Sequence, residues 1–181
     1  ESKIKTKIIE PTLNAINEYS GVYKGFLYVG LMIKEGEPFL IEFNVRMGDP
    51  ECQTILPMLE TDLYEIFNSC CENRLDDIKI NWNNKKSLCI VVCSKGYPDE
   101  YKKNIEIKNI KNLKLNSNDY LFHAGTLKKG DNIYSTGGRV LNFVSLSDSF
   151  DNARDNNLSH IKQLNWENGF FRNDIGYKVI D

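Results

Sequence analysis

The chain has 181 residues, of which 41% are hydrophobic and 27% charged, an ordinary globular composition. Its net charge of −2 gives no electrostatic footprint for nucleic acid, and no apolar run approaches the ~20 residues of a membrane-spanning helix. The length allows one or two domains, each with a hydrophobic core. The five cysteines are odd in number and show no CxxC spacing, which favours reduced thiols. We therefore expect a cytoplasmic protein without nucleic-acid or membrane partners.

The first half of the chain predicts helices around an antiparallel hairpin. Leu13 and Ile16 lie at helical spacing, so a helix is expected near residues 11–19. The apolar run at 26–33 predicts a strand, and turn residues lead from it into a returning strand at 39–46. Asp49 and Pro50 then predict a helix start, with Asp49 as the cap and proline at the first helical position.

The second half predicts mainly short strands. A polar stretch at 76–87 indicates a boundary, and we place it between residues 84 and 85, which divides the chain into 1–84 and 85–181. The continuous apolar run at 88–93 predicts a buried strand, and spaced apolar residues predict a closing helix at 150–164. Short strands are expected at 104–110, 119–126, 132–136 and 139–145.

The strand at 39–46 has the most informative pattern. Because successive side chains of a strand point to opposite faces, Glu42, Asn44 and Arg46 share one face. The other face is apolar and should anchor in hydrocarbon; it consists of Phe39, Ile41, Phe43 and Val45. A carboxylate and an amide oxygen suit Mg²⁺, which often takes one or two protein ligands plus phosphates, and the arginine suits the phosphoryl charge. The alternative is a solvated polar face.

Two loops add candidates for binding. Asp49 and Glu51 either hold the ammonium of an amine substrate or, in the case of Asp49, only cap a helix. Gly137 and Gly138 allow a close backbone approach or a tight turn, and Arg139 after them is placed for a phosphate. The alternative for this second loop is a hairpin turn with a surface arginine.

Together these segments resemble the phosphoribosylamine–glycine ligase (glycinamide ribonucleotide synthetase) family of the ATP-grasp superfamily. The matching stretches follow family order over nearly the whole chain: Tyr23-Lys-Gly-Phe-Leu-Tyr-Val-Gly-Leu-Met32, Ile41-Glu-Phe-Asn-Val-Arg-Met-Gly-Asp-Pro-Glu51, Gln53 with Leu56-Pro57, Ser94-Lys-Gly-Tyr-Pro98, Phe122-His-Ala-Gly-Thr126, Gly137-Gly-Arg-Val-Leu141 and Phe171-Arg-Asn-Asp-Ile-Gly176.

The resemblance implies an α+β fold: the C-terminal part of an ATP-grasp core, an antiparallel sheet with helices, followed by a small β-rich C-terminal domain. It implies ATP-dependent ligation of glycine to 5-phosphoribosylamine through a glycyl phosphate, giving glycinamide ribonucleotide, ADP and phosphate in purine synthesis. The remaining N-terminal part of the enzyme would be this chain's partner, and most of the nucleotide lid would belong to it. We therefore expect the 181-residue chain to be inactive alone.

The resemblance also implies residue roles. Glu42 and Asn44 match the family's ligands for Mg²⁺ (or Mn²⁺), and Met32 falls where related ligases pack an apolar side chain on the adenine of ATP. Arg46 and Asp49 match catalytic positions. The implied substrate-binding residues are Arg46, Gly48, Asp49, Pro50, Glu51, Gly138 and Arg139, with Arg139 as a clamp on the ribose phosphate.

One departure from related enzymes bears on the metal site. Many ATP-grasp enzymes carry an acidic metal ligand on the preceding strand, but residues 22–33 contain none, and Gly30 occupies the approximate place. Two competing interpretations remain: another ATP-grasp carboxylate–amine ligase, or a non-catalytic module that binds a phosphorylated ligand or a partner chain.

Overall fold

The structure is a computed structural model that describes residues 1–180. The chain forms two compact units, and each is described by itself. The first unit comprises residues 1–49 and 60–81, and the second comprises residues 50–59 and 82–181. The segment 50–59 thus belongs with the C-terminal part of the chain, and the division at 84/85 remains a prediction.

The first unit combines a long N-terminal helix with the expected hairpin. Its helical elements are α1 (Ser2–Ile4), the π-helical η1 (Lys5–Ile9), α2 (Glu10–Ser20), α4 (Leu63–Cys71) and the 3₁₀ helix η3 (Leu75–Asp77). Strands β1 (Tyr28–Lys34) and β2 (Glu37–Asn44) pair in antiparallel fashion. The side chain of Asp62 caps α4 by accepting a hydrogen bond from the Tyr64 amide at 2.7 Å.

The second unit is built on a four-stranded antiparallel sheet with the order β5-β8-β3-β9. A smaller sheet has the order β4-β7-β6. The strands are β3 (Lys86–Ser94), β4 (Ile105–Glu106), β5 (Asp119–His123), β6 (Thr126–Lys129), β7 (Asn132–Ser135), β8 (Arg139–Ser147) and β9 (Gly169–Phe170). The helices are α3 (Glu51–Ile55), η2 (Leu56–Met58), η4 (Lys108–Asn112) and α5 (Phe150–Leu164).

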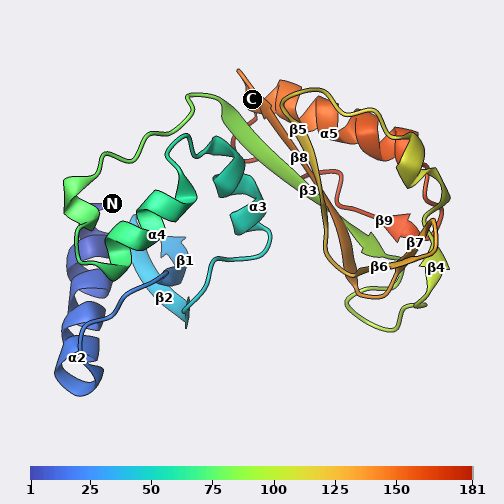
Figure 1. Cartoon of the computed structure of the whole chain (residues 1–181). Helices are drawn as coiled ribbons and strands as arrows, with labels where there is room; N and C mark the ends of the chain where they lie inside the picture. The colour runs from blue at the N-terminus through green and yellow to red at the C-terminus, as the bar shows by residue number, and fades with distance from the viewer. Residues whose placement is uncertain (181) are drawn as a thin grey trace. The chain divides into compact units, whose positions relative to one another are not determined.

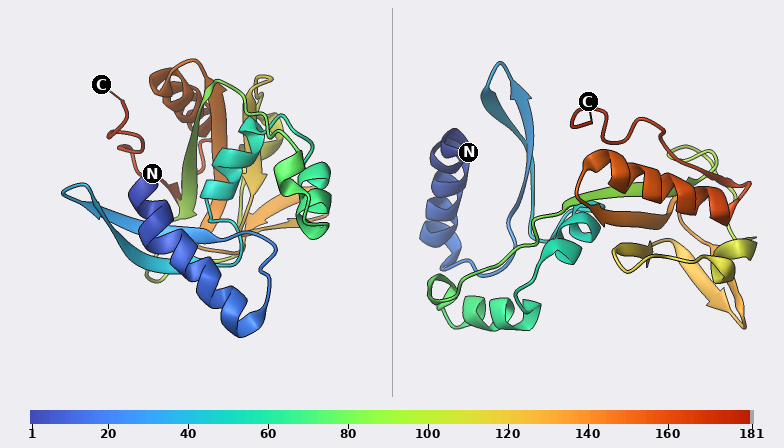
Figure 2. Two further views of the ribbon diagram at one scale, coloured as in Figure 1. Left: turned by 90° about the vertical axis from the view of Figure 1, so that its left-hand side faces the viewer. Right: turned by 90° about the horizontal axis from the view of Figure 1, so that it is seen from above.

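Helix α5 packs along β3 and β8 and buries the core of this unit (Figures 1 and 2). The core residues are apolar and alternate along the strands or repeat along the helix: Leu88, Ile90, Val92, Leu141, Phe143, Ala153, Ile161 and Leu164, among others. Asn157 lies in this core and ties three elements together. Its amide nitrogen donates to the Leu88 carbonyl, and its amide oxygen accepts from the Ser145 hydroxyl, both at 2.8 Å.

The expected apolar anchor of the hairpin is not formed by the described residues. Phe39, Ile41, Phe43 and Val45 are 53%, 65%, 38% and 72% exposed. A two-stranded ribbon has no layer of its own to cover a face, so its apolar side chains stay open unless another element packs on them. In this structure Phe39 lies opposite Met32 and therefore on the same face as Glu42, because Ile41 is an extra residue in β2, and Val45 lies beyond the end of the strand. The prediction that these four side chains form one buried apolar face is therefore wrong for this chain.

Candidate active site

The predicted pair on β2 lies side by side. The Asn44 amide nitrogen donates to a Glu42 carboxylate oxygen at 3.1 Å, and the Glu42 side chain is exposed while Asn44 is half-buried. Both groups are therefore on one face and open to a ligand. A half-turn of the Asn44 amide would bring its oxygen beside the carboxylate, which is the donor set expected for a hard cation.

Met32 on β1 lies on the same face as Glu42 and Asn44, beside a bulge in β2. Gly30 pairs with Glu42, but the next residue of β1, Leu31, pairs with Leu40, so Ile41 is an extra residue in β2. Side chains alternate along the regular strand β1, and Met32 therefore faces the same way as Gly30, its cross-strand partner Glu42, and Asn44. The bulge also places Phe39, the cross-strand partner of Met32, on this face, which strict alternation along β2 would not give.

Gly30 leaves room beside the carboxylate. A Cβ at Gly30 would lie 3.0 Å from the Glu42 Cγ and 3.6 Å from the Tyr28 ring. This confirms that position 30 faces the same space as Glu42, the place where an acidic ligand is expected in related enzymes. Because glycine contributes no oxygen there, the protein donors on this face are those of Glu42 and Asn44. Among residues 1–180, no group of three or more His, Cys, Asp or Glu residues could hold a metal ion.

Arg46 and the turn that follows differ in detail from the expectation. Strand β2 ends at Asn44, so Arg46 lies in a bend, where its guanidinium donates to the Met47 carbonyl at 2.9 Å. The row of alternating polar groups therefore ends with Asn44. Helix α3 begins at Glu51 with Pro50 as its N-cap residue, not Asp49, and no side-chain hydrogen bond caps it. Asp49 is exposed and Gly48 buried.

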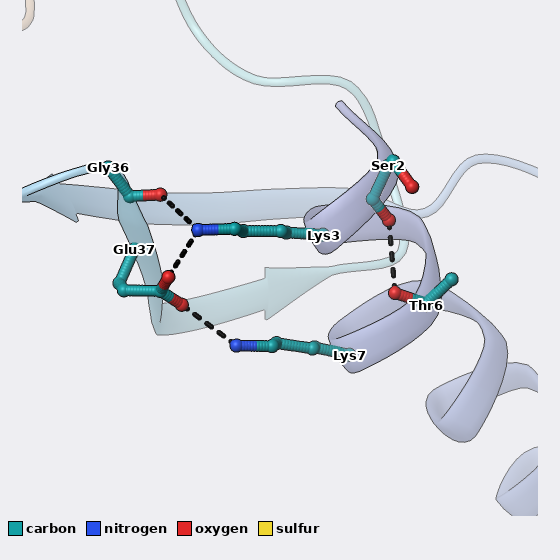
Figure 3. A network of polar contacts seen from close by, with 6 residues as sticks. All are labelled: Ser2, Lys3, Thr6, Lys7, Gly36 and Glu37. Atoms are coloured by element: carbon teal, nitrogen blue, oxygen red, sulfur yellow. Dashed lines mark hydrogen bonds and ion pairs between the residues drawn. The ribbon is translucent and has the colours of Figure 1, made fainter.

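The hairpin is fixed to the N-terminal helix by a charged cluster at its turn (Figure 3). Lys3 and Lys7 both bind the Glu37 carboxylate, Lys7 at 2.8 Å, and Lys3 also donates to the Gly36 carbonyl at 3.4 Å. The hydrogen bond from Lys3, followed by that from Lys7, lowers the pKa of Glu37 to about 2. The cluster connects the first helical turns to the start of β2, the strand that carries the candidate metal ligands.

The second candidate group lies in the other unit, at the turn before β8. Gly138 is packed against an aromatic ring: a Cβ there would lie 2.1 Å from the Tyr97 Cδ2. Gly137 is packed against the backbone of Gly125, whose own Cβ would lie 2.6 Å from the Gly137 Cα. The close approach that the glycines were expected to allow is thus made by the protein itself. Contact of Gly138 with substrate stays a prediction.

Arg139 begins β8 and is exposed. Its carbonyl accepts a hydrogen bond from the Gly125 amide at 2.9 Å, and in the sheet it lies opposite Cys93. Burial raises the pKa of the Cys93 thiol, and the positive charge of Arg139 opposes part of that rise. Arg139 thus places a positive charge on an exposed residue at the start of β8.

Each unit thus brings together part of the predicted site. In the first unit, Glu42, Asn44 and Met32 share a face, with Arg46 just beyond the strand; in the second, Gly138 and Arg139 share a turn. The unit boundary falls between Asp49 and Pro50, inside the Gly-Asp-Pro-Glu motif. Sequence reasoning gave no role to Ser94, Tyr97 and Gly125, although all three lie in motifs of the family resemblance, and it is these residues that surround the turn.

Two family models match this chain, and each matches a segment that carries one of the two groups of candidate residues. A family model described as phosphoribosylglycinamide synthetase, C domain, matches residues 87–178, slightly more than half of the chain. A second, described as phosphoribosylglycinamide synthetase, ATP-grasp (A) domain, matches residues 1–52, which include Glu42, Asn44 and Arg46. The first unit therefore carries ATP-grasp sequence. The chain belongs to the phosphoribosylglycinamide synthetase family.

Individual relatives agree with this assignment. Phosphoribosylamine–glycine ligase of Caldanaerobacter subterraneus is 41% identical over 174 residues, which are 96% of this chain and 41% of the relative. A chloroplastic phosphoribosylamine–glycine ligase of Arabidopsis thaliana is 39% identical over 181 residues, 98% of this chain and 34% of the relative. The crystal structure of phosphoribosylamine–glycine ligase from Thermotoga maritima matches with a TM-score of 0.74 and 28% identity, over 97% of this chain and 42% of that one.

These matches confirm the expected α+β fold of the C-terminal region of the family. The chain spans about two fifths of the length of the bacterial relatives it matches. No helix within residues 1–180 is long and apolar enough to cross a membrane.

Proposed function

We propose that the chain is the C-terminal portion of an ATP-dependent carbon–nitrogen ligase that joins glycine to 5-phosphoribosylamine in purine synthesis. The products are glycinamide ribonucleotide, ADP and phosphate, and the intermediate is glycyl phosphate. The observation that carries this proposal is the exposed Glu42–Asn44 pair within the segment that matches the ATP-grasp domain of this family. The remaining N-terminal part of the enzyme, which supplies most of the nucleotide lid, is its partner, and we place the enzyme in the cytoplasm.

Catalysis of this kind depends on positioning and on neutralising charge, and it needs no protein nucleophile. Phosphorylation of the glycine carboxylate places an anionic phosphoryl group between ATP and the acceptor oxygen. Arg46, one bend beyond β2, supplies a positive charge for that group. Asp49, with Glu51 after it, holds the glycine ammonium and so presents the carboxylate.

Mg²⁺ (or Mn²⁺) bound with ATP would neutralise part of the negative charge of the nucleotide phosphates. Glu42 and Asn44 fit such an ion as a partial donor set: two neighbouring side chains with oxygen atoms, open to solvent, beside the space that Gly30 leaves. These two side chains would hold the ion as protein ligands, which suits Mg²⁺ because it often takes only one or two of them. Met32, exposed on the same face, packs against the adenine ring.

Arg139 binds the phosphate of phosphoribosylamine. Its exposed guanidinium, at a turn held rigidly by its neighbours, can form two parallel hydrogen bonds to phosphate oxygens. Gly48, Pro50 and Gly138 are the remaining residues that we assign to substrate binding. The family match disfavours the two competing interpretations, because the C-domain segment that carries Arg139 belongs to this ligase family.

The test is the activity of the full-length enzyme that contains this chain. We expect ADP release, followed by a coupled pyruvate kinase and lactate dehydrogenase assay, to require both glycine and phosphoribosylamine. Glycinamide ribonucleotide should appear in equal amount when the products are analysed by mass spectrometry. ADP release that proceeds at full rate with a different carboxylic acid in place of glycine, or with no amine, would contradict the proposal.

A further inference from the structure

The turn that presents Arg139 is enclosed by two other segments of the second unit. One is the end of β3 with the residues that follow it, 94–98, and the other is the connection between β5 and β6, 123–126. Both segments lie in family motifs to which the reaction itself gives no role. Both segments contact the turn at residues 136–139, which end in Arg139.

Ser94 makes the most specific of these contacts. It is 2% exposed, its amide donates to the Gly138 carbonyl at 2.7 Å, and its hydroxyl donates to the Gly137 carbonyl at 2.8 Å. One residue thus binds two successive carbonyls. A carbonyl group lies in the plane of its peptide, so hydrogen bonds to two successive carbonyls orient two successive peptide planes. This pair of hydrogen bonds therefore defines the direction in which the chain enters β8 at Arg139.

Gly125 closes the turn from the other side. Its carbonyl accepts from the amides of Thr136 and Gly137 at 2.7 and 3.3 Å, and its amide donates to the Arg139 carbonyl at 2.9 Å. The Tyr97 ring lies over Gly138, where no side chain larger than hydrogen fits. Groups of the protein thus hold the turn at four successive residues, 136–139.

We infer that Ser94 is a positioning residue for phosphate binding: by binding the Gly137 and Gly138 carbonyls, it holds the Arg139 guanidinium where it meets the ribose phosphate. The inference rests on the proposed function, in which Arg139 is the phosphate clamp. Ser94 does not contact the substrate, and its effect passes through the backbone of the turn.

The experiment compares matched serine variants of the full-length enzyme. Ser94→Ala removes the hydroxyl bond to Gly137 and keeps the backbone bond. Ser94→Thr keeps a hydroxyl and should restore function. Ser135→Ala is the control, because Ser135 is fully buried in the same unit but its hydroxyl has no hydrogen-bond partner among residues 1–180. We expect Ser94→Ala to raise the KM for phosphoribosylamine by about two- to tenfold, as loss of one hydrogen bond predicts, with kcat and the KM for ATP unchanged.

A double-mutant cycle separates positioning from a general structural effect. In an Arg139→Ala background, Ser94→Ala should raise the KM for phosphoribosylamine no further, because its target is gone. A full additional effect of Ser94→Ala in that background, or an equal effect of Ser135→Ala in the wild-type background, would overturn the inference.

Amide hydrogen exchange distinguishes failure of this inference from failure of the proposed function. Ser94→Ala should speed exchange at Thr136 and Gly137, the amides that close the turn on Gly125, and Ser135→Ala should not. Unchanged exchange at these amides would overturn the positioning role whatever the substrate is. Faster exchange combined with an Arg139→Ala enzyme of unaltered KM would instead mean that the phosphate assignment of Arg139 is wrong.

Discussion

The amide nitrogen of Asn44 lies 3.1 Å from a carboxylate oxygen of Glu42, and the two side chains stand together on the open face of β2. Two residues of one strand, two positions apart, are held there by backbone geometry alone, without loop residues that must become ordered. The strand therefore places two ligands at little cost in conformational entropy, which suits an ion that takes most of its remaining coordination from phosphate and water.

Replacing Glu42 or Asn44 should weaken binding of the metal ion. In the full-length enzyme, we expect Glu42→Gln and Asn44→Ala each to raise the Mg²⁺ concentration that gives half-maximal rate by at least about tenfold, with lower turnover. The control is Glu35→Gln, a carboxylate exposed at the turn of the same hairpin. Rates measured across a Mg²⁺ titration check this, and curves that superimpose on the wild type would contradict the metal role.

Removing the Arg139 guanidinium should chiefly weaken binding of the phosphorylated substrate. A charged hydrogen bond contributes about 1.5–3 kcal/mol, so we expect Arg139→Ala to raise the KM for phosphoribosylamine by about 10- to 150-fold. Arg139→Lys should restore only part of this, because an ammonium group lacks the paired donors of a guanidinium. Lys128→Ala, an exposed cation on β6, serves as the control. If the KM for ATP alone changed, the phosphate clamp would be the wrong assignment.

The 181-residue chain by itself should have no ligase activity. It spans about two fifths of the length of its bacterial relatives, and apolar side chains of β2 are exposed. We expect the purified chain to release no ADP in the presence of ATP, glycine and phosphoribosylamine, whereas the full-length enzyme should do so under identical conditions. Glycine-dependent ADP release from the purified chain would disprove this expectation.

The buried pair of His160 and Asp119 should make the second unit sensitive to acid. The His160 Nε2 lies 2.9 Å from an Asp119 carboxylate oxygen, and Asn116 donates to the same oxygen at 2.7 Å. Burial alone raises the pKa of Asp119, but hydrogen bonds from His160, Ser145 and Asn116 outweigh it, so the pKa lies below its ordinary value. The stabilisation is therefore complete above about pH 4 and is lost as the pH falls through the lowered pKa.

Asp119→Ala should lower the free energy of unfolding by about 3–5 kcal/mol at pH 7, because it leaves the buried His160 without its partner. The exposed Asp155→Asn, on α5, is the control. Urea unfolding followed by tryptophan fluorescence measures both, and repeating it from pH 7 to pH 3 should show a smaller decline with acid in the Asp119→Ala variant. Parallel declines in the two proteins would contradict the account.

The cluster around Glu37 should give this carboxyl group a measurably low pKa. Because hydrogen bonds from Lys3 and Lys7 lower its pKa from 4.5 to about 2, its interaction with the helix is complete above pH 4.5 and disappears as the pH falls towards 2. An NMR titration of the Glu37 carboxyl carbon should show this midpoint. Replacing Lys3 and Lys7 together by methionine should return the midpoint to its ordinary value, while Lys34→Met should leave it low.

The sequence by itself determined the periodic elements and the family. The helix at α5 and the strands β3 and β8 were predictable because their burial repeats with the period of the element, and Glu42 and Asn44 were predictable as neighbours because alternation in a strand is a local rule. The ordered motifs identified the family, since each requires particular residues at fixed spacing. Glu42 and Asn44 are two positions apart in one strand, and this spacing alone places their side chains next to each other.

Only the tertiary structure decided features that depend on partners distant in the chain. The bulge at Ile41 became visible in the pairing of β1 with β2, and it is this shift that places Phe39, opposite Met32, on the same face as Glu42. The packing of Gly138 on Tyr97 and of Gly137 on Gly125 joins residues 12 to 41 positions apart, and no local pattern encodes such contacts. The exposure of the apolar side chains of β2 has the same cause. An amphipathic strand specifies which of its side chains are apolar, but only the surrounding layers determine whether those side chains are buried.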